Sequence, residues 1–160
     1  MRNRIFSTLV ALLFIPSSAN CASAAVSEAD TKYAQAAGQA TQKFSTAIGN
    51  WGDTYQAAPT KVNSTEYKNW MKKAVAADGV VLGALKDFSR VKVSPGYKKS
   101  DITLRKFIKA YTSAIYQYAP AIKKNDRKLV RKANDALVAA TSLFTAWGND
   151  FARDTSLLTN

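Results

Sequence analysis

The stretch 101-DITLRKFIKAYTSAIYQYAPAI-122 decides the fold class of this chain. Its large apolar residues recur at alternating steps of four and three, the spacing that places side chains on one face of an α-helix. Pro120 falls inside the series, and because proline lacks a backbone donor and clashes with the preceding turn, we expect it to bend or end this helix. The series comprises Leu104, Ile108, Tyr111, Ile115, Tyr118 and Ile122.

Two more helices with the same periodicity are predicted before this stretch. The first begins near Ser27, whose short oxygen-bearing side chain can satisfy free backbone N–H groups, and it is stopped by Pro59. The second covers about residues 64–91, because Asn63-Ser64-Thr65-Glu66 is typical of a helix start. The sequence Ser94-Pro95-Gly96 then predicts a turn before the third helix.

A fourth helix is predicted after Asn125 or Asp126, either of which can cap it. Each of the four stretches has one wide apolar face and a short connection to the next. This pattern predicts an all-α fold, an up-down antiparallel four-helix bundle, and no strand-like alternation competes with it. The apolar rows of the fourth helix are Leu129, Ala133, Ala136, Ala140, Leu143 and Trp147, with Val130, Leu137, Phe144 and Phe151 beside them.

Residues 1–24 have the layout of a secretory signal peptide, and residues 25–160 are expected to form one helical-bundle domain. Two arginines precede an apolar run at 5–15, which is too short to span a bilayer. The triplet Ala22-Ser23-Ala24 predicts cleavage behind it, so we expect export to a periplasm, a cell surface or the medium. A lipid anchor through Cys21 is the alternative, because a lone cysteine after an apolar run is where a bacterial lipoprotein is cut and acylated.

The predicted mature chain contains no histidine and no cysteine. This composition removes the commonest metal ligand and the usual general base near neutral pH. No nucleophile motif and no glycine-rich phosphate loop is present either. We therefore expect a protein that is not an enzyme and that holds no metal and no cofactor.

Positive charge is concentrated in one part of the sequence. Residues 61–132 hold eighteen Lys/Arg against five Asp/Glu, a net charge of +13, whereas the flanks of the predicted mature chain are slightly acidic. The stretch 123-KKNDRKLVRK-132 opens the fourth helix, where its basic residues repel one another and oppose the helix dipole. In a bundle it lies at the same end as the start of the second helix. The candidate anion-binding residues are Lys72, Lys73, Lys123, Lys124, Arg127, Lys128, Arg131 and Lys132.

Such a cluster predicts an anionic partner. An anionic envelope polymer, lipid headgroups and an acidic protein all qualify, and charge alone does not choose among them. Nucleic acid is a weaker candidate, because the basic residues lack the interleaved aromatic side chains that stack on exposed bases. The leading hypothesis is an exported monomer that binds through this surface, and a charged surface that serves only solubility is the competing explanation.

An alternative hypothesis is a small-ligand carrier with an aromatic pocket in the bundle core. An apolar pocket with converging tyrosine hydroxyls favours the carrier, whereas a packed core favours the surface. Gly79 and Gly83 share one face of the second helix, and we interpret them as a place where a neighbouring helix approaches closely. In the carrier hypothesis they open space beside the aromatic residues. The candidate pocket residues are Trp70, Tyr111, Tyr118 and Trp147.

Overall fold

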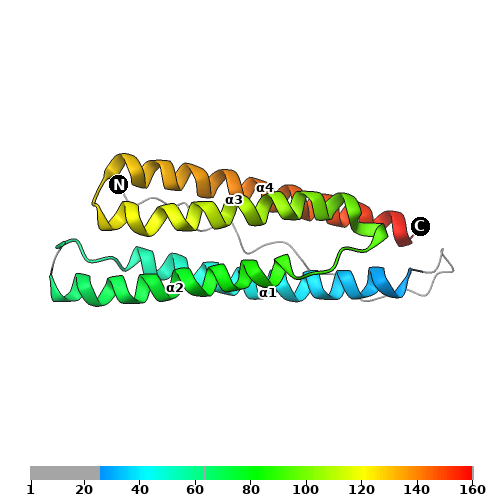
Figure 1. The fold of residues 1–160 in the computed structure, drawn as a ribbon, viewed down its shortest axis with the longest axis horizontal. Helices are drawn as coiled ribbons and strands as arrows, with labels where there is room; N and C mark the ends of the chain where they lie inside the picture. Colours follow the sequence, from blue (N-terminus) through cyan, green and yellow to red (C-terminus); the bar gives the residue numbers. More distant parts are fainter. Residues whose placement is uncertain (1–25, 63, 160) are drawn as a thin grey trace.

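The computed structural model describes residues 26–62 and 64–159, and this part of the chain is all-helical (Figure 1). It contains four long helices and no strand, as the periodicity predicted. The predicted signal peptide, including Cys21, lies outside the described residues. None of the described helices has the length and apolar character that crossing a membrane requires. In order, the elements are α1 (Glu28–Gln56), α2 (Thr65–Ser89), the 3₁₀ helix η1 (Pro95–Tyr97), α3 (Lys98–Lys123) and α4 (Arg127–Thr159).

The helices are arranged as two antiparallel pairs (Figure 1). One layer holds α1 and α2, and the other holds α3 and α4. The α1–α2 connection and the α3–α4 connection lie at the same end of the bundle, at the left of Figure 1, which we call the turn end. The α2–α3 connection, the start of α1 and the end of α4 lie at the opposite end.

Side-chain caps start three of the helices at the places that the sequence predicts. Ser27, Ser64 and Asp126 each accept a backbone N–H two or three residues further along, at 3.1, 3.1 and 2.8 Å. Asn125 has a φ of 49°, the left-handed conformation that commonly follows the last turn of a helix. Asn125 and Asp126 therefore end α3 and start α4 within a single short turn.

The third helix differs from its prediction at both ends. It begins one turn early, where Asp154 of α4 accepts the backbone N–H of Ser100 at 2.9 Å, a cap that comes from 54 residues away. Pro120 does not end the helix, which continues for three more residues. Pro120 has no backbone N–H to donate to the carbonyl of Tyr116, four residues earlier. Both residues are exposed, so water can hydrogen-bond that carbonyl instead.

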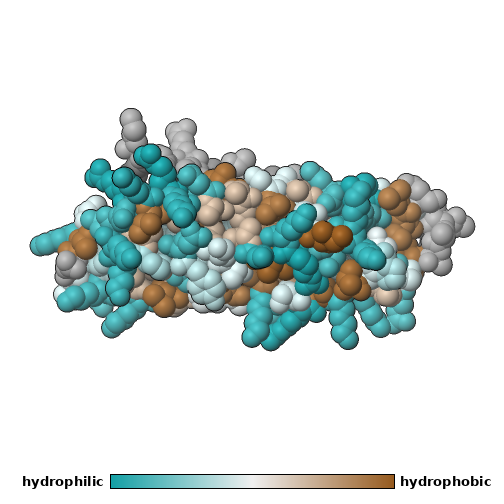
Figure 2. All heavy atoms as spheres, turned by 45° about the horizontal axis from the view of Figure 1, so that its top comes forward, coloured by the Kyte–Doolittle hydropathy of each residue, from teal (hydrophilic) through white to brown (hydrophobic). Residues whose placement is uncertain are grey.

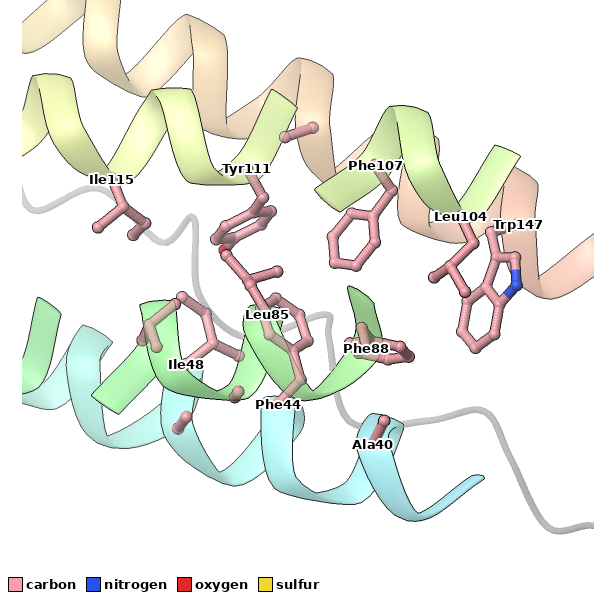
Figure 3. Packing of buried hydrophobic residues seen from close by; sticks show 14 of the residues in the cluster. Ala40, Phe44, Ile48, Leu85, Phe88, Leu104, Phe107, Tyr111, Ile115 and Trp147 are labelled. Atoms are coloured by element: carbon pink, nitrogen blue, oxygen red, sulfur yellow. The ribbon is translucent and has the colours of Figure 1, made fainter. Parts of the chain in front are cut away.

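The core is largely aromatic and is centred on Phe44 of α1 (Figure 3). The Phe44 ring contacts Phe88 of α2, Phe107 and Tyr111 of α3, and Phe144 of α4. The ring centroids lie 5.0 to 6.1 Å apart, and three of the four contacts are edge-to-face, the arrangement that aromatic rings favour. One side chain thus touches all three other helices and joins the two layers.

The buried face of α3 is rotated relative to the predicted apolar series, whereas the buried apolar residues of α4 all belong to its two predicted rows. Phe107 and Ala114 are fully buried although the series omits them, and Ile108 is only half-buried. In α4, Leu129 is 38 % exposed. A helix at the corner of a bundle meets two neighbours, so the buried face follows the direction between them and not a single row of large residues.

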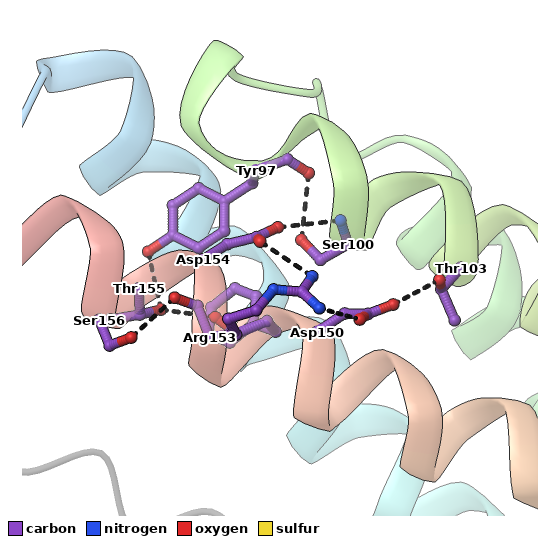
Figure 4. A network of polar contacts seen from close by, with 9 residues as sticks. Tyr97, Ser100, Thr103, Asp150, Arg153, Asp154, Thr155 and Ser156 are labelled. Atoms are coloured by element: carbon purple, nitrogen blue, oxygen red, sulfur yellow. Dashed lines mark hydrogen bonds and ion pairs between the residues drawn. The ribbon is translucent and has the colours of Figure 1, made fainter.

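Hydrogen-bonded carboxylates tie α4 to the start of α3 at the end opposite the turn end (Figure 4). Asp154, which caps α3 through Ser100, also pairs with Arg153 at 3.2 Å. Arg153 reaches Asp150 at 2.9 Å, and Asp150 accepts a hydrogen bond from the Thr103 hydroxyl at 2.7 Å. The Thr103 hydroxyl, helped by Arg153, holds the pKa of Asp150 below its ordinary value. Acidic side chains at this end are therefore engaged in packing the bundle together.

Candidate anion-binding surface

The eight predicted anion-binding residues are all exposed and belong to the turn end of the bundle. Six of them come from the end of α3 and the start of α4, whereas Lys72 and Lys73 come from the first turns of α2. The Tyr67 hydroxyl joins the two groups by donating to the carbonyl of Ile122 at 3.3 Å, which holds the start of α2 against the end of α3. Figure 2 shows long hydrophilic side chains projecting at this end, at the left of the view.

Within the described residues, none of these eight side chains forms an ion pair. Their acidic neighbour Asp126 accepts hydrogen bonds from backbone N–H groups as the cap of α4. At the opposite end the arginines are compensated: Arg90 pairs with Asp87, Arg105 with Asp101, and Arg153 with Asp150 and Asp154. In the described part of the chain, the eight basic side chains of the turn end are therefore not paired with carboxylates, whereas the three arginines of the opposite end are.

Helix dipoles add little to the electrostatics of the turn end. Two helices start there and two end there, so their partial charges of opposite sign lie side by side. Lys123 and Lys124 at the end of α3 are favourably placed, whereas Arg127 and Lys128 at the start of α4 are not. The formal charges of the side chains consequently decide the sign of the potential at this end.

The four candidate pocket residues are buried, but they do not line one common space. Trp70 and Tyr118 each contact the ring of Tyr55, with centroid distances of 5.7 and 4.9 Å. Tyr111 lies nearer the middle of the core, and other apolar side chains separate it from Trp147 (Figure 3). The Trp70 indole N–H is already used, because it donates to a backbone carbonyl at 2.7 Å.

The interpretation of Gly79 and Gly83 as a close approach between helices is wrong. Both glycines are exposed, and a Cβ added at either would meet nothing within 4 Å. Gly83 lines an open groove of about 390 Å³ between α2 and α3, with Tyr116 on the α3 side. A second open groove, of about 600 Å³, lies between α1 and α2. None of the four candidate pocket residues lines either groove.

A buried carboxylate, which was not predicted from the sequence, lies between α1 and α2. Asp78 accepts a hydrogen bond from the Trp51 indole N–H at 2.7 Å and another from the Tyr55 hydroxyl at 3.0 Å. Burial raises the pKa of Asp78 above the ordinary aspartate value of 3.8, and the two donors offset only part of this effect. The sequence contains one sign that Asp78 is buried, because it is the single polar residue in the apolar stretch 74–85.

Asp78→Asn is expected to increase stability at neutral pH, with an advantage that shrinks as the pH falls. The pKa of Asp78 is higher in the folded than in the unfolded state, so its ionised form costs stability above the folded pKa. That cost disappears as the pH falls towards the unfolded value of about 3.9. Urea unfolding of the wild type and the variant between pH 4 and pH 8 checks this, and an advantage that is constant over the range contradicts it.

The described residues contain no cluster of three or more His, Cys, Asp or Glu that could hold a metal ion. No protein-family model, curated protein or solved structure matches the chain. The chemistry of its surfaces is therefore the guide to its function.

Proposed function

We propose that this chain is an exported binding protein that engages an anionic envelope component or an acidic protein through the turn end of its helical bundle. The observation that carries the proposal is the set of eight exposed basic side chains that form no ion pair within the described residues. Export is inferred from the signal-like segment 1–24.

Crowding of like charges has a cost that a bound anion removes. Two unit charges 10 Å apart in water repel by about 0.4 kcal/mol, and the eight residues form many such pairs. The same bundle places carboxylates beside three arginines at the opposite end, where they offset part of the positive charge. A polyanion or an anionic surface supplies the missing negative charge to several lysines and arginines at once.

The shape of the turn end favours an extended partner over a single small anion. The basic residues come from three helices, and the two grooves described above are lined by residues of α1, α2 and α3 away from them. A polymer chain, a sheet of lipid headgroups or an acidic protein surface can contact residues spread in this way. Binding of that kind depends strongly on ionic strength, because most of the charges are solvent-exposed.

The turn-end variant K123Q/K124Q/R127Q/K128Q tests the proposal on the chain that lacks residues 1–24. We expect it to weaken binding to anionic phospholipid vesicles, a heparin-like glycan or an acidic protein by tenfold or more, with its helical circular dichroism unchanged or its thermal midpoint slightly raised. A tenfold change corresponds to about 1.4 kcal/mol. The measurement is a titration at several salt concentrations.

The matched control is K92Q/K98Q/K99Q/K106Q, which removes the same charge from exposed lysines at the opposite end. We expect it to weaken binding by less than threefold. Equal losses in the two variants mean that only net charge matters, and unchanged binding in the turn-end variant means that its lysines and arginines serve solubility alone. Either result rejects the turn end as a recognition surface.

A further inference from the structure

The outer surface of α2 is apolar over about three turns. Between residues 74 and 85 the one polar residue is Asp78, and its carboxylate is turned into the core. Val75 and Val80 are each 58 % exposed. A helix at the corner of a bundle normally carries polar residues on its outer side, and an apolar outer side marks a surface that is covered in use.

This face has the form of a shallow channel. Gly79 and Gly83 run along its middle, and helical geometry places Val75 and Val80 on either side of them. Towards α3 the channel continues into the open groove of about 390 Å³, where Tyr116 is 65 % exposed. Because the distance between packed helices depends on the side chains at the contact, a channel floor of glycine and the small side chain of Ala76 admits a helix at close range.

Lysines lie on the same outer face at both ends of the channel. Lys72 and Lys86 are 14 residues apart, a separation of about 21 Å along the helix. Neither forms an ion pair within the described residues. Two acidic residues of α2 do not compensate these lysines, because Asp78 is buried and Asp87 already pairs with two other basic residues. The outer face of α2 therefore carries positive charge at both ends of the channel and no charge between them.

These features select one kind of occupant. A second copy of α2 would bring Lys72 against itself or against Lys86, so like charges would meet in either orientation. A lipid bilayer would gain little from Gly79 and Gly83, because they bring no apolar side chain to bury. A helix of another protein, apolar in its middle and acidic towards its ends, matches both the channel and its lysines.

We propose that the outer face of α2 and the adjoining α2–α3 groove bind an amphipathic helix of another protein, which presents small apolar residues to the channel and Asp or Glu side chains to Lys72 and Lys86. This helix-binding face lies beyond the turn end and shares only Lys72 with the candidate anion-binding residues. It extends the function proposed above without depending on it.

The test uses a synthetic helical peptide of 21 residues with Ala and Leu along one face and two Glu near each end, in fluorescence titrations with the chain that lacks residues 1–24. We expect this peptide to bind at least tenfold more tightly than a shuffled peptide of the same composition and than a version with Lys in place of Glu. The variant G79Q/G83Q should lose at least tenfold in affinity. Its thermal midpoint should not fall, because both sites are open and glycine is a poor helix former.

The matched control is G49Q, an exposed position in α1 where an added Cβ also meets nothing within 4 Å. It should bind the peptide within twofold of the wild type. The turn-end variant K123Q/K124Q/R127Q/K128Q should still prefer the peptide over its shuffled form, which separates this proposal from the proposed anion-binding function.

Four results would each overturn the proposal that this face binds a helix of another protein. They are equal binding of the shuffled peptide, undiminished binding by G79Q/G83Q, absence of binding by the wild type, and a dimer in sedimentation that G79Q/G83Q abolishes. The first result reduces the interaction to charge, the second moves it elsewhere on the bundle, the third removes it, and the fourth assigns the face to a second copy of the chain.

Discussion

Phe44→Ala is expected to lower the free energy of unfolding by about 3–5 kcal/mol. Phe44 is 1 % exposed, and its ring touches rings from all three other helices. Truncation removes the transfer free energy of the ring and leaves a cavity that aromatic neighbours cannot easily fill, because rigid rings collapse poorly into a space left by one of them. For a domain of this size the loss is a large part of the total stability.

Urea unfolding followed by circular dichroism measures the effect, with Tyr116→Ala as the control. Tyr116 is also aromatic, but it is 65 % exposed, so its truncation should change stability by no more than about 0.5 kcal/mol. A loss below about 1.5 kcal/mol for Phe44→Ala contradicts the role of Phe44 as the contact between layers. The surrounding rings would then be able to repack without it.

Phe44→Ala is also expected to disturb the candidate anion-binding surface, because the residues of that surface come from both layers. Lys72 and Lys73 belong to the α1–α2 layer, whereas the other six belong to the α3–α4 layer. Packing of the layers through Phe44 keeps these two groups at one end. A variant that loosens the packing is therefore expected to weaken binding to a polyanion even though it changes no charge.

Local signals explain most of what could be predicted from the sequence. The helices follow from apolar periodicity, and Ser27, Ser64 and Asp126 mark starts that depend only on residues within one turn. The position of the basic cluster follows from topology, since short connections between antiparallel helices return the start of α2 and the start of α4 to the same end.

Contacts between distant residues explain what could not be predicted. The cap of α3 comes from Asp154, 54 residues from Ser100, so the sequence near Lys98 carries no sign of a helix start. Gly79 and Gly83 are spaced like a helix contact, yet their face points outward because α2 buries its other side, which carries the large apolar residues. The sequence shows which residues share a face of a helix, but the direction of that face depends on the neighbouring helices.

Arg105→Ala is expected to lower the free energy of unfolding by about 2 kcal/mol, because one guanidinium secures the connection between the two layers. Arg105 Nη1 donates to the carbonyl of Ser89 at 2.7 Å, and Nη2 donates to the carbonyl of Val91 at 2.8 Å. Nε and Nη2 also bind the two oxygens of Asp101 at 3.1 and 2.9 Å. Removal of Arg105 leaves the carbonyls of Ser89 and Val91 without these donors and Asp101 without its partner.

Arg105→Lys separates the geometry of the guanidinium from its charge. An ammonium group keeps the charge but cannot reach both carbonyls and both carboxylate oxygens at once, so the variant should recover less than half of the lost stability. The double variant Arg105→Ala/Asp101→Asn should be less destabilised than the sum of its single changes, since it no longer leaves a carboxylate unpaired. Additive losses, or full recovery with lysine, contradict a geometric role for Arg105.

Arg105→Ala is also expected to affect the helix-binding face. Ser89, whose carbonyl Arg105 binds, lines the groove between α2 and α3 together with Ile108 and Thr112. Without Arg105 the end of α2 is free to shift relative to α3, which alters the groove but leaves the turn end in place. Arg105→Ala should therefore weaken binding of the acidic helical peptide more than binding of a polyanion. The opposite order contradicts the assignment of the two ligands to separate surfaces.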